Sequence, residues 1–214
     1  MSSSHDENAV NPWWARVPGE RYWLDVTNRQ GRDECLAAPR GTGRRAESWT
    51  LRLITHVRDG DVVFHFDGVQ QAIAAWSVSH GRVEKRQISW AAPGTRTNSG
   101  DQTVPSWSIG LRDSTRLDEP VALYDIARVQ WDLFPTLRAL EDEAGATLHY
   151  PFEMGDRHST RPIAGYVFKL PAVFVQSFPE LARAAGHVNR LQPGHQRAPQ
   201  PAGALAVHPL AHSR

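Results

Sequence analysis

The chain contains very little cysteine and very little lysine. Its 214 residues include one cysteine, Cys35, which excludes an internal disulfide and a zinc site built from cysteines. Lys85 and Lys169 are the only lysines among 24 basic residues. Almost every cationic side chain is therefore an arginine, whose planar fork can bind phosphate through two parallel hydrogen bonds. Codon usage in a GC-rich gene would produce the same bias, so the bias alone identifies no phosphate ligand.

Long apolar runs are also missing. No run approaches the roughly 18 residues that cross a bilayer, and the polar start, Met-Ser-Ser-Ser-His, lacks the apolar core of a signal peptide. A hydrophobic content of 40% and a charged content of 22% are ordinary for a soluble domain. We therefore expect a cytoplasmic protein with no membrane partner. A length of 214 residues is enough for one domain with tails.

Acidic residues disappear near the C-terminus. None follows Glu180, and this last part is rich in proline, glycine, alanine and histidine without a sustained period. Such a composition predicts disorder, so we expect a disordered basic tail at 184–214, one folded domain at 12–183 and a disordered start at 1–11. The histidines of the tail lack the spacing of metal ligands, and no metal site is predicted. The arginines after Glu180 are Arg183, Arg190, Arg197 and Arg214.

The folded part mixes strands and helices. Residues 21–27 alternate between two faces, which is typical of a strand. Residues 28–43 are polar and predict a loop. Ser48 is a typical N-cap for a helix that the Asp-Gly pair at 59–60 ends.

A hairpin of residues 61–66 and 72–79 follows, because two runs rich in β-forming residues flank a turn. The remaining predicted elements are strands at 83–90, 107–111, 120–123 and 165–170, a long loop at 91–105, a helix from Asp125 through Pro135 to Gly145, and a last helix from Pro171. The sequence thus predicts an α+β fold, a small curved β-barrel or sheet with flanking helices.

Tryptophan is abundant, with eight residues in the chain. Its large ring is rarely fully buried, so this number indicates either an aromatic core or a surface on which flat ligands stack. Trp13 and Trp14 crowd the first ordered segment, and Trp90 and Trp107 flank the long loop. We expect only a minority of the eight to contact a ligand.

Several strings resemble an EVE-type domain of the PUA-like superfamily. The most telling are Glu-Arg-Tyr-Trp-Leu-Asp-Val-Thr-Asn-Arg at 20–29, Ser48-Trp49, Gly-Asp-Val-Val-Phe-His-Phe at 60–66 and Ile-Ala-Ala-Trp-Ser at 73–77. Later strings that fit the same group are 150–152, 161–162, 165–171 and 178–181. The chain is similar in particular to the N-terminal head domains of McrA-type modification-dependent HNH endonucleases.

This resemblance implies a PUA-like fold and a reader of modified bases, such as methylated cytosine, in double-stranded DNA. A flipped base needs aromatic faces on both sides and a few hydrogen-bonding groups along its edge. The candidate residues for such a base pocket are Tyr22, Trp23, Trp49, His65, Trp76 and Ser77. The candidate phosphate-binding residues are Arg40, Arg44, Arg45 and Arg96.

Each candidate also has a structural interpretation. Tyr22 shares a face with Leu24 and is a core position by pattern, and Trp49 falls in the apolar stripe of its helix. His65, between two phenylalanines, fits a buried histidine with a structural hydrogen bond. Single arginines are usually solvated.

Two other functions remain open. The His-Phe-Asp string at 65–67 has the look of a metal-binding pair and suggests a metal-dependent nuclease or hydrolase, although no third ligand is indicated nearby. An RNA-binding member of the same superfamily is the other alternative. Because the sequence shows no Gly-x-Ser-x-Gly, no phosphate-binding glycine loop and no HNH-type cysteine or histidine set, we predict no catalytic residue and no cofactor. We expect a chain that binds without cutting, with a separate nuclease as a further partner.

Overall fold

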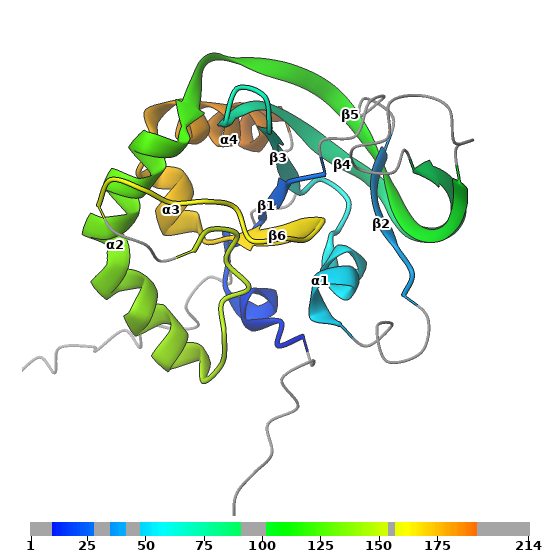
Figure 1. Ribbon diagram of the computed structural model, residues 1–214, viewed down its shortest axis with the longest axis horizontal. Coiled ribbons are helices and arrows are strands. Elements are labelled where there is room, and N and C mark those ends of the chain that lie inside the picture. The colour runs from blue at the N-terminus through cyan, green and yellow to red at the C-terminus, as the bar shows by residue number, and fades with distance from the viewer. Residues whose placement is uncertain (1–9, 28–34, 42–47, 91–101, 154–156, 192–214) are drawn as a thin grey trace, which may run out of the picture.

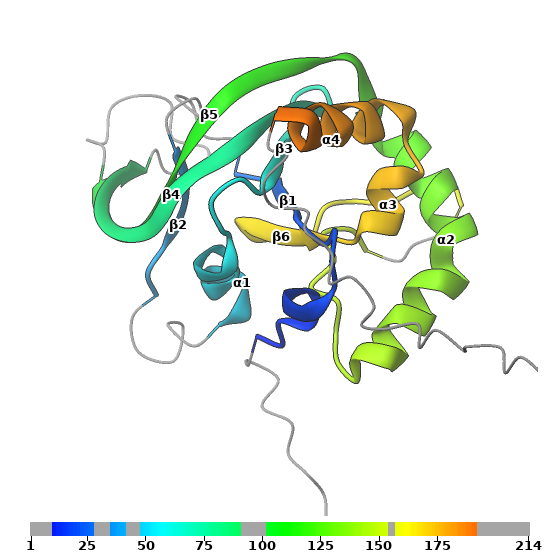
Figure 2. The same cartoon turned by 180° about the vertical axis from the view of Figure 1, so that it is seen from behind.

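A strongly curled six-stranded mixed sheet forms the centre of the molecule (Figures 1 and 2). The computed structural model describes residues 10–27, 35–41, 48–90, 102–153 and 157–191. The strand order is β2-β5-β4-β3-β1-β6, with β1 and β3 parallel and the other pairs antiparallel. The strands are β1 (Tyr22–Asp25), β2 (Cys35–Pro39), β3 (Val62–Asp67), β4 (Ala72–Trp90), β5 (Gln102–Ala122) and β6 (Val167–Leu170).

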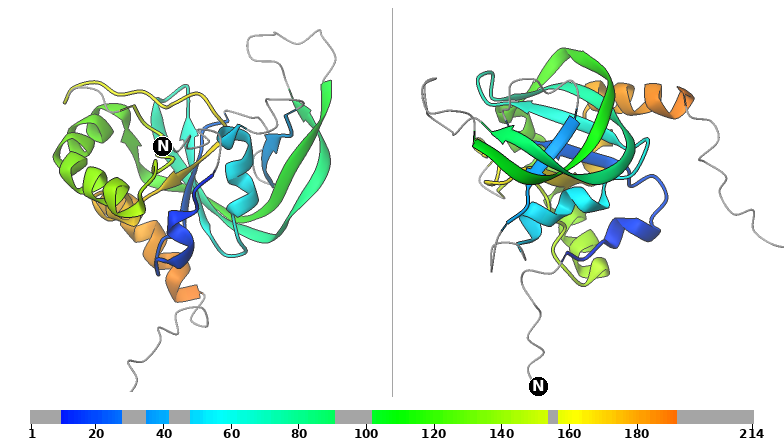
Figure 3. Two further views of the ribbon diagram at one scale, coloured as in Figure 1. Left: turned by 90° about the horizontal axis from the view of Figure 1, so that it is seen from below. Right: turned by 90° about the vertical axis from the view of Figure 1, so that its right-hand side faces the viewer.

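Helices of different lengths cover both faces of this sheet. The helices are η1 (Trp13–Arg16), α1 (Trp49–Arg52), η3 (Leu53–His56), α2 (Leu123–Ala144), α3 (Ala172–Gln176) and α4 (Pro179–Leu191). Figure 3 shows α1 and α4 on opposite sides of the curled strands. No helix of the described residues is long and apolar enough to span a bilayer. The observed class is therefore α+β with a curled sheet, as the sequence predicted.

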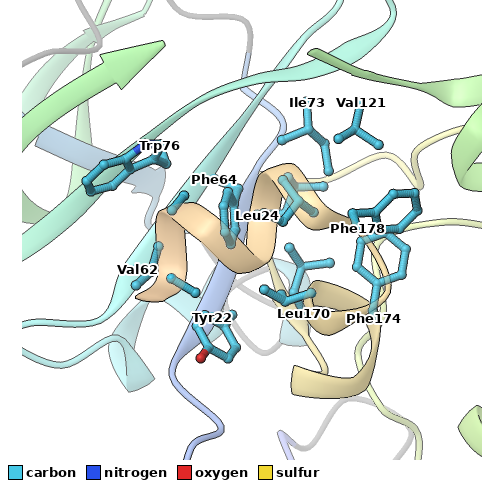
Figure 4. Packing of buried hydrophobic residues seen from close by; sticks show 14 of the residues in the cluster. Tyr22, Leu24, Val62, Phe64, Ile73, Trp76, Val121, Leu170, Phe174 and Phe178 are labelled. Atoms are coloured by element: carbon cyan, nitrogen blue, oxygen red, sulfur yellow. The ribbon is translucent and has the colours of Figure 1, made fainter. Parts of the chain in front are cut away.

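Alternation along the strands divides the core in two. One face of the sheet, here called the α4 face, carries Tyr22, Phe64 and Trp76, which pack with α3 and α4 (Figure 4). The opposite face, here called the α1 face, carries Trp23 and Val63, which pack with η1, α1 and η3. Neighbouring residues of one strand thus lie in different cores.

The two long strands differ from the prediction. β4 and β5 have 19 and 21 residues, whereas the pattern predicted four separate strands in the same region. Their pairing contains register shifts between Ile73 and Ala75, between Trp76 and Val78 and between His80 and Glu84. Each shift breaks the two-residue period on which strand prediction depends. The shifts let one continuous ribbon bend and so curl the sheet.

Two further boundaries are corrected. Residues 35–39 were predicted as loop but form the edge strand β2, whose alanines and final proline have low β-propensity. The last helix continues to Leu191, past the predicted domain boundary at 183. Ala184 and Val188 are buried in the core of the α4 face, so this part of the predicted tail belongs to the folded domain.

Candidate nucleic-acid interface

A chain of buried polar groups crosses three neighbouring strands on the α1 face. His65 on β3 lies between Asp25 on β1 and Ser77 on β4. Its Nδ1 is 3.1 Å from Asp25 Oδ2, and its Nε2 is 2.8 Å from Ser77 Oγ. Asp25 and His65 are each 4% exposed, and Ser77 is 0% exposed. Thr27 donates to Asp25 Oδ1 from its amide at 2.8 Å and from its hydroxyl at 2.6 Å.

These bonds affect the pKa of the Asp25 carboxyl. Burial opposes ionisation of Asp25, but the hydrogen bonds from His65 and Thr27 outweigh it and lower the pKa of this carboxyl. An ionised carboxylate only accepts, so Nδ1 of His65 carries a proton. Ser77 Oγ forms the hydrogen bond to Nε2 on the other side of the ring. The two bonds hold the imidazole in one orientation.

The same row continues to an arginine. Asp25 pairs with His65 across β1 and β3, His65 pairs with Ala75 across β3 and β4, and Ala75 pairs with Arg116 across β4 and β5. Paired residues of adjacent strands lie on one face. Because Ala75 is small, space remains between the imidazole and the guanidinium.

A cavity of about 310 Å³ occupies this space, at the lower end of the range for ligand pockets. Its polar lining comes from His65, Asp67, Gln70, Ser114, Arg116 and Asp118. Arg116 and Asp118 form no ion pair within the described part of the chain. The cavity therefore offers an uncommitted cation and an uncommitted acceptor for the edge of a polar ligand. His65 is the only residue of this lining with an aromatic ring.

Farther along β5, the strand that carries Arg116, Trp107 lies between two cations. It pairs with Lys85 on β4 and with Ala38 on β2, and it packs at the margin of the core of the α1 face. The guanidinium of Arg40 lies 5.1 Å from the centre of the indole ring, and Lys85 Nζ lies 5.5 Å from it. Trp107 is partly exposed, and both cations are exposed. We call Arg40, Lys85 and Trp107 the cation–indole platform.

The six predicted pocket residues do not surround one pocket. Tyr22 and Trp76 lie on the α4 face, where Figure 4 shows both in the packed core, whereas Trp23, His65 and Ser77 lie on the other side of the sheet. The ring of His187 closes over Trp76 with centroids 5.9 Å apart. The prediction of one base pocket lined by all six residues is therefore wrong, because the alternation of the strands places them in two different cores.

The prediction that Trp23 lines a base pocket is also wrong, because neither face of its ring is free. It is 1% exposed, its Nε1 donates to Asp61 at 2.9 Å, and Trp14 packs edge-on against it at 5.3 Å. Trp49 at the start of α1 is half-buried and packs on His149 at 4.9 Å and on Phe168 at 5.9 Å. Trp49 keeps some exposure, but its neighbours are core residues.

Of the predicted phosphate-binding residues, Arg40 is exposed beside Trp107. Arg44, Arg45 and Arg96 lie outside the described residues. The sequence did not predict a role for Lys85, Trp107 or Arg116 in a binding site. The signal for Lys85 was its rarity, but only the pairing of β4 with β5 brings it to Trp107.

Ser77, His65 and Asp25 follow the order of nucleophile, base and orienting acid in a serine hydrolase. Ser77 is, however, fully shielded, and the lining of the cavity includes His65 but not Ser77. The three residues have the hydrogen bonds of such a triad, but a substrate cannot reach the Ser77 hydroxyl. Within the described ranges, no group of three or more histidine, cysteine, aspartate or glutamate residues could hold a metal ion.

The chain matches no protein-family model and no curated protein. Among solved structures it is similar to Rpa0253 from Rhodopseudomonas palustris, solved by NMR, with 13% identity and a TM-score of 0.37 over 83% of this chain and 99% of that one. It is also similar to a Pseudomonas putida protein solved by X-ray crystallography, with 12% identity and a TM-score of 0.33 over 78% of this chain and 98% of the other.

Proposed function

We propose that this chain is a PUA-like domain of the EVE type that reads a modified base in double-stranded DNA without cutting it. In this proposal it acts in the cytoplasm, and a separate nuclease is the effector. The observation that carries the proposal is the cation–indole platform, because it gathers one partly exposed aromatic ring and two exposed cations, Arg40 and Lys85, on one surface.

The platform has the chemistry of nucleic-acid binding. Cations supply the salt-dependent attraction to phosphate, and an aromatic face adds about 1–3 kcal/mol per stacked base. Neither Arg40 nor Lys85 has an acidic partner in the described part of the chain. Their charges are therefore available to an anionic ligand.

The cavity beside Arg116 supplies the second part of the proposal. A base that leaves the duplex is recognised through hydrogen bonds to its edge. Arg116 donates hydrogen bonds and Asp118 accepts them, which suits an edge that carries both acceptors and an amino group. Ala75 leaves room at the floor, and the bonded His65 gives that end of the cavity a fixed shape.

The test is the affinity of the full chain for three duplexes of one sequence that carry cytosine, 5-methylcytosine or 5-hydroxymethylcytosine, at one stated salt concentration. We expect one modified duplex to bind roughly 5- to 150-fold more tightly, which corresponds to about 1–3 kcal/mol. Equal affinities for all three would contradict the proposal. Tighter binding to single-stranded RNA of the same sequence would favour an RNA-binding function instead.

A further inference from the structure

The long helix α2 exposes an unusual number of aromatic side chains. Five large hydrophobic side chains are clearly exposed in the described part of the chain, and three of them lie on α2. Tyr124 is 58% exposed, Trp131 is 48% exposed and Phe134 is 38% exposed. Another side of the same helix carries the buried residues Ile126, Gln130 and Leu137, whereas the buried Ala127 lies at the border of the exposed side. The helix therefore has one apolar face in the core and a second in solvent.

Arginines complete this second face. Tyr124, Trp131 and Arg138 are spaced by seven residues and lie along one line of the helix, with Arg128 close to it. Arg138 lies over the ring of Phe134 at 5.3 Å and pairs with Glu141 at 2.9 Å. Both arginines are more than half exposed. Tryptophan, tyrosine and arginine are the residues most enriched among the energetically dominant positions of protein interfaces.

The spacing of this face is self-complementary. Tyr124 lies seven residues before Trp131 and Arg138 lies seven residues after it, which is about 10 Å along the axis in each direction. If two copies of α2 pack antiparallel about a two-fold axis at Trp131, the tyrosine of each copy meets the arginine of the other. The two tryptophans then meet at the centre. A two-fold contact uses the same patch on both copies, and this face meets that requirement.

We propose that the chain forms a symmetric homodimer through the exposed face of α2. Two Tyr124–Arg138 cation–π contacts and one Trp131–Trp131 contact hold the copies together. The antiparallel arrangement also places the opposite ends of the two helix dipoles side by side. This inference does not depend on the function of the α1 face.

Sedimentation of the full chain tests the proposal over concentrations from about 1 µM upward, the range in which a weak dimer forms. We expect the wild-type chain to change from monomer to dimer. Trp131→Asp should weaken the dimer at least about 30-fold, as expected for a central interface residue. Val69→Asp is the matched control, because Val69 is 86% exposed on the turn between β3 and β4 and lies outside α2.

A charge exchange tests the antiparallel register. Arg138→Glu alone should weaken the dimer, and adding Tyr124→Arg should restore it, because an arginine–glutamate pair then forms twice across the axis. The two positions are about 21 Å apart within one helix, so the rescue cannot occur inside a single copy. A wild-type chain that stays monomeric over the whole concentration range would overturn the proposal. Equal loss of dimer in Val69→Asp, or no rescue in the double variant, would also overturn it.

Discussion

At the scale of single residues, the buried polar groups of the α1 face differ in how much each contributes to the free energy of unfolding. His65 satisfies a buried carboxylate on one side and a hydroxyl on the other. Removing it leaves Asp25 ionised and buried with only Thr27 as a donor. Removing Ser77 breaks one hydrogen bond to an imidazole that keeps its other partner.

We therefore expect unequal losses of stability from two alanine substitutions. His65→Ala should lower the free energy of unfolding by about 3 kcal/mol, and Ser77→Ala should lower it by about 1 kcal/mol. Urea unfolding at neutral pH measures both. Equal losses would contradict the assigned hydrogen bonds. An ester-hydrolysing or nuclease activity that disappears in Ser77→Ala at unchanged stability would instead assign catalysis to these residues.

His149 is a second buried residue with an unusual environment. It is 4% exposed, its backbone has a φ of 55°, and its Nδ1 has no partner within the described residues. Its Nε2 accepts from the amide of Asn11 at 3.3 Å. Burial, with a smaller contribution from the nearby His56, lowers the pKa of His149 to about 4. The neutral imidazole is thus the form that the fold accommodates.

This lowered pKa predicts acid sensitivity. Between the ordinary histidine value of 6.5 and about 4, the unfolded chain binds a proton that the folded chain does not. The free energy of unfolding should therefore fall as the pH decreases through this window, by about 3 kcal/mol in total. In His149→Asn this decrease should shrink, because asparagine tolerates a positive φ and does not titrate. Thermal unfolding against pH measures it, with exposed His80→Gln as the control. An unchanged pH profile in His149→Asn would contradict the assignment.

At the scale of the elements, β4 and β5 bring together what the sequence separates. Lys85 and Trp107 are cross-strand neighbours, and Arg40 follows the end of β2 at the same place. Substitution of Arg40 or Lys85 should weaken DNA binding without changing the fold, because both cations are exposed.

Two kinds of variant should therefore differ in their effect on binding. Trp107→Ala should weaken binding roughly 5- to 150-fold by loss of stacking. Arg40→Gln and Lys85→Gln should each reduce the slope of log K against log salt by about 0.9, the value for one lost phosphate contact. Fluorescence anisotropy over a salt series measures both. Arg183→Gln on α4 is the control. If the control variant weakens binding as much as Arg40→Gln, the platform is not the interface.

Most elements could be predicted from local patterns, and the site could not. The hairpin of β3 and β4, the end of α2 at Gly145 and the strand before Pro171 follow from turn residues and periodicity. Alternation also predicted that Tyr22 and Trp23 face opposite sides. The site depends on which strands pair and in what register, and the bulges of β4 and β5 hide this information. Arg116 therefore gave no signal in the sequence.

At the scale of the whole molecule, the proposed function uses only one face of the sheet for binding. Its α4 face packs against α3 and α4 and is closed, whereas its α1 face carries the bonded His65, the cavity at Arg116 and the cation–indole platform. In the proposed function, two places on this face have different tasks. We expect the platform to hold nucleic acid of any sequence and the cavity to distinguish the modified base.

The most direct test is the ratio of affinities for modified and unmodified duplex, measured for the wild-type chain and for Arg116→Gln. Arg116 is exposed and lies outside the platform, so its substitution should leave binding to unmodified DNA nearly unchanged. We expect a ratio of roughly 5 to 150 for the wild-type chain and a ratio close to one for Arg116→Gln. A ratio of one for the wild-type chain, or the same high ratio in the variant, would contradict it.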